Sequence, residues 1–257
     1  MTVAFAYSPP RDFTAKLRRA MTQNTPARPA RLKFDAPVLS VCFDDFPHSA
    51  ALYGAAALEA RGARGTFYAS ASLSGRHTPS GLGFTAEDLR KLRAAGHEIG
   101  CHSFSHHDCA RLDPFIALKD IARNRDAMAE LGLDAPMRSL AFPYGETNSE
   151  LKAMLPPRFE TARGVARGLN AGKVDLAQLR AFPLYGEGGL ERAHLALAQA
   201  AKRKAWMIAF THDVSDAPSD FGTSVAALED FLDAAIASGF QIKTMADALS
   251  AAEVKKL

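Results

Sequence analysis

The sequence predicts an α/β protein whose parallel strands are rolled into a barrel, with the helices on the outside. Strand-like and helix-like segments alternate from residue 38 almost to the C-terminus, which is typical of a parallel sheet with crossover helices. The length of 257 residues suits one α/β barrel of about 250 residues. Polar residues also gather where the predicted strands end. We therefore expect an N-terminal arm and helix, residues 1–37, and a single barrel domain, residues 38–257.

Apolar runs and capping signals place the individual elements. Residues 38–43 and 206–211 are uninterrupted apolar runs, as expected for strands buried on both faces. Thr85 precedes an acidic first turn, and Pro114 stands at the favoured first position of a long helix. Residues 26–37 hold three prolines and are expected to be a linker. Further strands are expected at residues 65–69, 97–100, 139–142, 161–162, 179–182 and 240–244, with a loop at 70–83; helices are expected at 13–22, 49–61, 85–95, 114–131, 149–155, 190–203, 225–238 and from 245.

Composition limits the classes of partner. The net charge of +3 is too small to demand nucleic acid or an acidic membrane. The start of the chain lacks the pattern of a signal peptide, and no stretch reaches the ~20 apolar residues of a transmembrane helix. A cytoplasmic protein is expected. Cys42, Cys101 and Cys109 are odd in number and lack Cys-x-x-Cys spacing, so a disulfide scaffold is not expected.

Two motifs together predict a metal site. His102 and His106 stand four residues apart after the strand at residues 97–100, a spacing that lets two imidazoles turn to one cation. The pair alone also fits ordinary surface or core histidines. Asp44 and Asp45 end the strand at residues 38–43 and add carboxylate ligands. Cys101 and Cys109 flank the histidines; either could be a ligand, although buried packing is the favoured interpretation.

Two further strand ends carry residues of the same kind. Pro143, Tyr144 and Gly145 follow the strand at residues 139–142, and His212 follows the strand at residues 206–211. Because barrel enzymes collect their chemistry at the carboxyl ends of the strands, the convergence of four strand ends predicts one active site.

These motifs resemble those of a known family. Phe43-Asp44-Asp45, His102-Ser-x-x-His106, Phe142-Pro-Tyr-Gly145 and Thr211-His212-Asp213 match, in order, the NodB-type polysaccharide deacetylases, carbohydrate esterase family four. The resemblance spans residues 38–248. It implies a distorted (β/α) barrel of about seven parallel strands with outer helices. It also implies a metal-dependent hydrolase that removes an N-acetyl group, a linear amide, from an amino sugar of a polysaccharide or its precursor. The tail after His212 is similar to bacterial members linked to lipopolysaccharide or exopolysaccharide synthesis.

The resemblance also implies roles for single residues. Asp45, His102 and His106 would bind one divalent ion, most simply Zn²⁺, with Co²⁺ and Ni²⁺ as alternatives. Asp44 would be the general base and His212 the general acid.

The loops around these residues receive smaller roles. The backbone N–H of Tyr144 would stabilise the oxyanion. Ser103 would orient its loop by a hydrogen bond. Simpler interpretations remain beside these: the aspartate pair could cap a helix, and His212 could be a hydrogen-bonded histidine without a proton to deliver.

The sequence departs from the family pattern at three places. Phe46 replaces a glycine and could crowd the site or line a sugar subsite. The arginine expected before Pro143 is missing, so Arg163 or Arg180 could supply a replacement cation. The Asp-x-x-Asp-Trp element is also missing, and the only tryptophan is Trp206. Two alternative functions therefore stay open: a catalytically weakened carbohydrate-binding protein on the same fold, and a small-molecule amidohydrolase.

Overall fold

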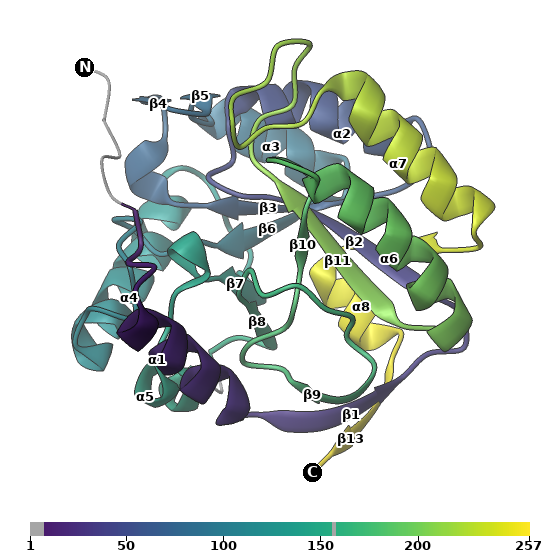
Figure 1. Ribbon diagram of the computed structural model, residues 1–257. Coiled ribbons are helices and arrows are strands. Elements are labelled where there is room, and N and C mark those ends of the chain that lie inside the picture. The colour runs from purple at the N-terminus through teal and green to yellow at the C-terminus, as the bar shows by residue number, and fades with distance from the viewer. Residues whose placement is uncertain (1–7, 156–157) are drawn as a thin grey trace.

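The computed structural model describes residues 8–155 and 158–257. Its centre is a curled parallel sheet, and seven of its strands form a path from one edge to the other (Figure 1). The strands are β2 (Val38–Phe43), β3 (Thr66–Ala69), β6 (Glu98–Cys101), β7 (Ser139–Ala141), β8 (Thr161–Arg163), β10 (Phe182–Pro183), β11 (Trp206–Thr211) and β12 (Gln241–Ile242). The order along the path is β10-β11-β2-β3-β6-β7-β8, and β12 pairs with the start of β2. This confirms the predicted distorted (β/α) barrel.

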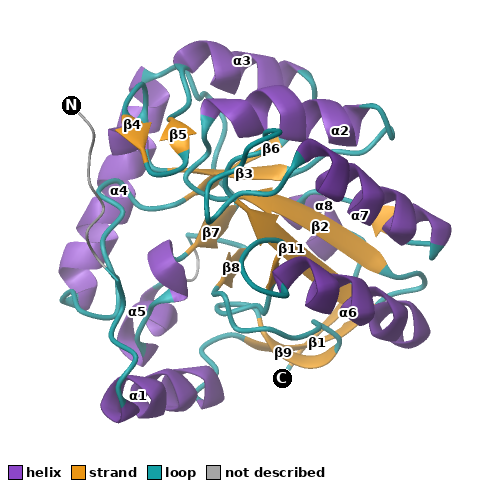
Figure 2. Cartoon of the chain, turned by 45° about the horizontal axis from the view of Figure 1, so that its top comes forward, coloured by secondary structure: helices purple, strands orange, loops and turns teal. Residues whose placement is uncertain are grey.

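Helices surround this sheet, and α2, α3, α6 and α7 cover one side of its outer face (Figure 2). The helices are α1 (Phe13–Asn24), α2 (Ala55–Glu59), α3 (Ala86–Ala94), α4 (Pro114–Glu130), α5 (Ser149–Met154), α6 (Gly189–Arg203), α7 (Val225–Ala237) and α8 (Met245–Ser250). Among the residues that the structure describes, no helix combines the length and apolar character that a membrane span requires.

Capping explains where several helices begin. Thr85 and Asp88 form a reciprocal capping box at the start of α3, and Asp113 accepts hydrogen bonds from two amides in the first turn of α4. Asn148 caps α5 by accepting a hydrogen bond from the amide of Leu151. Each side chain satisfies amides that have no partner within the helix. The ends of α3, α4 and α5 agree with the predicted ends to within one or two residues.

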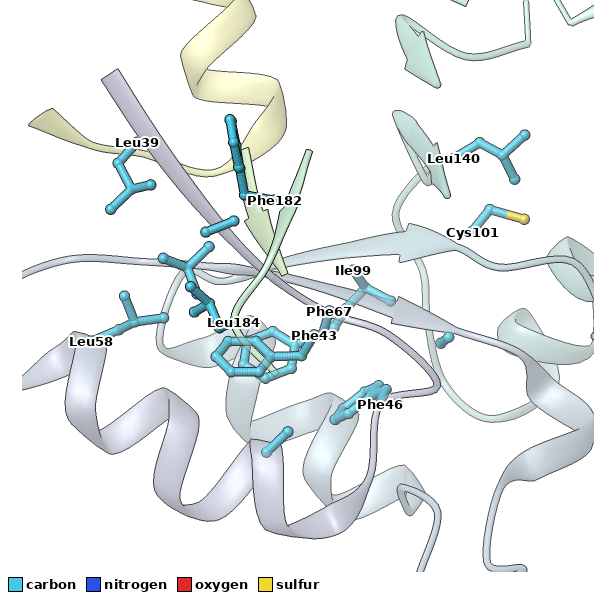
Figure 3. Close-up of a cluster of buried hydrophobic side chains, with 14 of the residues drawn as sticks. Leu39, Phe43, Phe46, Leu58, Phe67, Ile99, Cys101, Leu140, Phe182 and Leu184 are labelled. Atoms are coloured by element: carbon cyan, nitrogen blue, oxygen red, sulfur yellow. The ribbon is translucent and has the colours of Figure 1, made fainter. Parts of the chain in front are cut away.

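The side chains of the central strands point alternately to two sides of the sheet, and this divides the core into two clusters. Leu39 and Phe43 of β2 face the outer helices (Figure 3), whereas Val38 and Cys42 face the barrel interior. Successive residues of a strand point to opposite sides, so one six-residue apolar strand serves both clusters. Because both sides are covered, the run can be apolar throughout.

A small antiparallel sheet, absent from the sequence prediction, closes the amino end of the barrel. It has the order β13-β1-β9, with β1 (Pro29–Lys33), β9 (Gly172–Asp175) and β13 (Glu253–Lys256). Leu32 of β1 is buried in the interior cluster, and Phe34 packs edge-on against Trp206 at the start of β11, with ring centres 6.3 Å apart. The predicted linker at residues 26–37 therefore contains a strand. The alternation of buried and exposed residues in β1 is a strand signal that the prolines conceal.

Two other segments differ from the prediction. The expected loop at residues 70–83 holds a 3-10 turn (Ala71–Leu73) and a hairpin of β4 (His77–Thr78) and β5 (Gly81–Leu82). The expected continuous helix at residues 49–61 begins with a π-helical segment (Ala50–Gly54) before α2. Both segments lie between β2 and α3 in the chain.

Candidate active site

Three of the predicted residues meet at the carboxyl ends of β2 and β6. One oxygen of Asp45, Oδ1, lies 2.9 Å from Nε2 of His106 and 3.5 Å from Nε2 of His102. The three possible ligand atoms all lie within 4.8 Å of one another. This cluster brings together the carboxylate and the two imidazoles that the sequence analysis assigned to the metal.

A hydrogen bond at one ring nitrogen of His102 leaves the lone pair of its other ring nitrogen available to a metal. Nδ1 of His102 donates to the carbonyl oxygen of Ala141 over 2.8 Å; because a carbonyl can only accept, Nδ1 carries the proton and Nε2 is unprotonated in the neutral ring. A backbone carbonyl on the second nitrogen is the usual arrangement around a metal-bound histidine. One carboxylate and two Nε2 atoms form a donor set that fits Zn²⁺ and similar ions.

Burial and charge set the protonation of this cluster. Burial lowers the pKa of His102 to about 4, which keeps its imidazole neutral near pH 7. Burial alone would raise the pKa of the Asp45 carboxyl, but the charge of His106 and its hydrogen bond outweigh that effect and hold the pKa well below its usual range. The neutral His102 imidazole and the ionised Asp45 carboxylate are in the state that binds a cation, and His106 must release a proton to join them.

Left-handed backbone conformations concentrate at this cluster. Asp45, Ser103, His106 and Tyr144 have φ angles of 57°, 60°, 53° and 58°, and Phe46 has a φ of 46°. Residues other than glycine adopt such angles only when their surroundings enforce them, and they gather at functional sites. The loops after β2, β6 and β7 therefore place their side chains at a conformational cost that packing elsewhere offsets.

The buried guanidinium of Arg163, at the end of β8, forms an ion pair with Asp44 at the end of β2. Its carbon Cζ lies 4.8 Å from the ring centre of Tyr68 and 4.9 Å from that of Phe210, distances at which a cation and an aromatic face attract. Arg163 thus places a cation on the aspartate that the sequence analysis assigned as the base. Of the two arginines expected as replacements, Arg163 contacts Asp44.

Arg180 has a different environment. Its Nη1 donates to the carbonyl oxygen of Arg167, and its backbone N–H donates to the side chain of Asn170. Phe46 also lies away from the expected subsite, because it is fully buried and stacks on Phe84 with ring centres 4.7 Å apart. The idea that Phe46 lines a sugar subsite is wrong; its φ angle directs it into the core beside Phe67 (Figure 3).

His212 lies on another side of this candidate site, at the end of β11. Its Nδ1 donates to the carbonyl oxygen of Phe221 over 3.2 Å, which leaves Nε2 as the ring atom that can exchange a proton. The rings of Tyr185 and Phe221 pack against it at 5.3 and 5.7 Å. Asp213 accepts hydrogen bonds from the amide and hydroxyl of Ser219, so it orients the following loop.

These side chains line one cleft of about 730 Å³. Its wall includes all six residues that the sequence analysis assigned to the site: Asp44, Asp45, His102, His106, Tyr144 and His212. Tyr185 and Phe221 belong to the same wall, and neither was expected from the sequence. Both follow predicted strands, at residues 179–182 and 206–211, so proximity to strand ends was the signal that could have identified them.

Ser103 does not orient its loop in the expected way. Its hydroxyl is buried and has no hydrogen-bond partner among the residues that the structure describes. Asp120 of α4 takes that role: its carboxylate accepts hydrogen bonds from the amides of Phe104 and Ser105 and from the Ser105 hydroxyl. A carboxylate on α4 therefore positions the turn between the two histidines.

The remaining cysteines and histidines lie outside the cluster. Cys101 and Cys109 are buried in the outer core cluster, as the packing interpretation predicted. His97 is packed against Phe67, and His48 pairs with Asp88 on α3 at 2.9 Å. Each of these side chains has a structural role.

Part of the sequence matches a family model of known proteins. The polysaccharide deacetylase family model matches residues 31–155, from β1 to the end of α5. This segment includes Asp44, Asp45, His102, His106 and Tyr144, and it ends before Arg163 and His212; the resemblance had been expected to reach residue 248. No curated protein matches the sequence.

Several solved structures share the architecture. The chitin deacetylase of Colletotrichum lindemuthianum has a TM-score of 0.62 and 16% identity, covering 84% of this chain and 89% of that one. A D285S mutant of peptidoglycan deacetylase PdaC from Bacillus subtilis has a TM-score of 0.57 and 18% identity, with 84% and 92% covered. A family 4 carbohydrate esterase from Streptomyces lividans, in complex with acetate, has a TM-score of 0.54 and 19% identity, with 81% and 92% covered. The match of the polysaccharide deacetylase family model over residues 31–155 and the fold shared with these structures agree with the resemblance of this chain to the NodB-type polysaccharide deacetylases, carbohydrate esterase family four.

Proposed function

We propose that this chain is a metal-dependent hydrolase that removes the N-acetyl group from an amino sugar of a polysaccharide or its precursor. The observation that carries the proposal is the composition of the cleft: a ligand set for one cation, a second aspartate held by a buried arginine, and a histidine on another wall. Amide hydrolysis needs an activated water, a stabilised oxyanion and a proton for the amine.

Asp45, His102 and His106 would hold the ion, for which Zn²⁺, Co²⁺ and Ni²⁺ are the candidates. A divalent ion bound there would supply Lewis acidity, which polarises a carbonyl and lowers the pKa of a bound water. The unprotonated Nε2 of His102, fixed by the bond from Nδ1 to Ala141, supports this assignment.

Asp44 is the proposed general base, and Arg163 is the residue that positions it. The ion pair with Arg163 places a positive charge on the carboxylate that would accept a proton from water. It also fixes the carboxylate through a hydrogen bond from a rigid, planar donor. Because the cation is buried between Tyr68 and Phe210, the pair is shielded from solvent.

Tyr144 and His212 complete the proposed chemistry. The backbone N–H of Tyr144 would donate to the carbonyl oxygen as it gains negative charge. A bond forms between the water oxygen and the carbonyl carbon, and the C–N bond then breaks. His212 delivers a proton to the departing nitrogen from Nε2, so the products are acetate and a free amine.

Aromatic side chains in the cleft support a sugar substrate. Phe221 is 47% exposed beside His212, and Tyr185 packs against the same histidine. Flat apolar rings of this kind provide stacking surfaces for sugar rings, while the volume of about 730 Å³ exceeds what an acetyl group needs. This favours a glycan over a small non-sugar amide.

The proposal of a weakened binding protein loses its main support. That alternative depended on the missing arginine beside the base, and Arg163 now provides such a cation from β8. A hydrolase is therefore the better interpretation of the cleft.

The test is acetate release from a panel of N-acetylated glycans, including oligomers of chitin and peptidoglycan and bacterial surface polysaccharides. We expect release that stops with a chelator and returns with added Zn²⁺, Co²⁺ or Ni²⁺. Asp45→Asn should lose bound metal and activity together, whereas Asp44→Asn should keep metal and lose turnover. Binding of a glycan by metal-free protein, with no acetate released from any substrate, would instead support the carbohydrate-binding alternative.

A further inference from the structure

Helix α1 turns three large apolar side chains to solvent. Phe13, Leu17 and Met21 are 77%, 52% and 63% exposed, while Ala15 and Thr22 form the buried side of the same helix. Residues four apart lie on one helix face, so the three side chains form a continuous apolar stripe. Single apolar residues on a surface are ordinary, but a contiguous group marks an interaction site.

The segment around this stripe is strongly basic. Residues 11–33 contain seven lysines and arginines and a single acidic residue, Asp12. The whole chain carries only +3, so the rest of the molecule has a net negative charge. The small overall charge, which spoke against an acidic membrane as partner, hides a separation of charge along the chain. Segments with such an excess of one sign bind surfaces of the opposite sign.

A row of cations crosses the small sheet that follows α1. Arg31 of β1 lies directly opposite Lys255 of β13 on one side and Lys173 of β9 on the other, and all three are exposed. Within the described ranges none of the three forms an ion pair, whereas the neighbouring Lys33 pairs with Glu253 at 3.3 Å. Like charges directly opposite one another destabilise a sheet, so the row costs stability unless an anionic surface compensates it.

The stripe and the row lie along one edge of the molecule. Helix α1 continues into β1 along the lower edge in Figures 1 and 2, and β13 runs beside β1. Arg19, on the other face of α1, lines the active-site cleft and pairs with Glu146. A surface that engaged the stripe would therefore hold the cleft close to it.

We propose that this edge is a docking site for a bilayer that contains anionic phospholipid. An amphipathic helix needs only a shallow apolar face, combined with attraction of Lys and Arg to acidic headgroups, to lie in a membrane interface. A stripe of three side chains is small beside the roughly 800 Å² per partner of a stable protein interface, which favours a bilayer over a second copy of the chain. The proposal concerns binding alone and is independent of the proposed reaction.

The test is sedimentation of the full chain with vesicles of phosphatidylcholine, with or without phosphatidylglycerol. We expect sedimentation only with phosphatidylglycerol, and release at high salt because the attraction is screened. Leu17→Glu should lower the partition coefficient about tenfold or more. Lys255→Glu should lower it by about 25-fold, since each unit of charge near an acidic surface contributes roughly a fivefold effect and the substitution changes the charge by two units.

Two matched variants on α6 serve as controls. Leu195 is 64% exposed and Lys202 is also exposed, so Leu195→Glu and Lys202→Glu should sediment like the unmodified protein. The proposal is overturned if the unmodified chain stays in the supernatant with acidic vesicles, or if the control variants weaken binding equally. It is also overturned if the chain forms a dimer that Leu17→Glu dissociates, because the stripe would then be an interface between copies.

Discussion

The guanidinium of Arg163 lies against the carboxylate of Asp44, although 119 positions separate the two residues in the sequence. Both side chains are buried, and the aromatic rings of Tyr68 and Phe210 flank the cation. The family pattern places an arginine before Pro143, where this chain has Phe142. The cation reaches the aspartate from β8 instead, so an equivalent electrostatic contact comes from a different strand.

Replacing Arg163 tests whether this contact serves the reaction. Arg163→Met should lower kcat about a hundredfold or more, because an unpaired Asp44 loses the contact that fixes its orientation. Removing one partner of a buried ion pair should also lower the free energy of unfolding by about 3–5 kcal/mol. Acetate release and urea denaturation measure the two effects. Bound metal should be unchanged.

A conservative and a distant substitution separate positioning from stability. Arg163→Lys keeps the charge but loses the planar donor geometry. Compared with Arg163→Met, it should therefore restore stability more fully than activity. Arg180→Met, which removes the other candidate arginine, should leave kcat unchanged. Equal loss of kcat in Arg180→Met would show that Arg163 has no special relation to Asp44.

Much of the barrel could be predicted because its signals are local. The apolar runs that became β2 and β11 have the predicted boundaries, since burial on both faces leaves no polar interruption. The candidate metal-binding cluster was predictable because parallel strands bring their carboxyl ends to one rim, which places Asp45 near His102 and His106.

The features that could not be predicted depend on contacts between segments that are distant in the sequence. Strand β13 consists of exposed residues throughout, and only its pairing with β1 makes it a strand. The pairing of Arg163 with Asp44 likewise requires the curvature that brings β8 over the interior. Local propensity contains no information about either contact, so the sequence offered Arg163 and Arg180 as equal candidates.

Replacing His212 tests the proton donor. His212→Ala should lower kcat for an N-acetyl substrate by about 10²–10⁴-fold, because an amine leaves poorly without a proton. Hydrolysis of 4-nitrophenyl acetate should fall much less, since its leaving group departs as a stable anion. His77→Ala on the exposed hairpin should change neither rate. Equal losses on the two substrates would assign His212 to binding or packing.

Lys152 ties α1 to the barrel. Its buried ammonium pairs with Asp175 at 2.7 Å and donates to the carbonyl oxygens of Thr22 and Thr25 at the end of α1, where a positive charge is favoured. Lys152→Met should lower the free energy of unfolding by about 3 kcal/mol or more, measured by urea denaturation. Hydrogen exchange should also show faster exchange in α1. Lys202→Met, at an exposed site, should change neither measurement.

His97 should make stability depend on pH. Its Nδ1 accepts a hydrogen bond from the amide of Gly65 over 3.0 Å, so this nitrogen must be unprotonated in the folded chain. Burial lowers the pKa of His97 below its usual value. The unfolded chain therefore binds the proton more readily, and stability falls as the pH drops below about 6.5, the unfolded value.

The expected slope is at most about 1.4 kcal/mol per pH unit, the effect of one proton. It should be measured as the free energy of unfolding in urea from about pH 7.5 to 5.5, a window that spans the unfolded pKa. His97→Gln removes the titrating group and should flatten the curve, while the contribution of His102 stays in both proteins and cancels in the comparison. Parallel curves for the two proteins would mean that another group controls the acid response, and that His97 binds protons equally well in the folded and the unfolded chain.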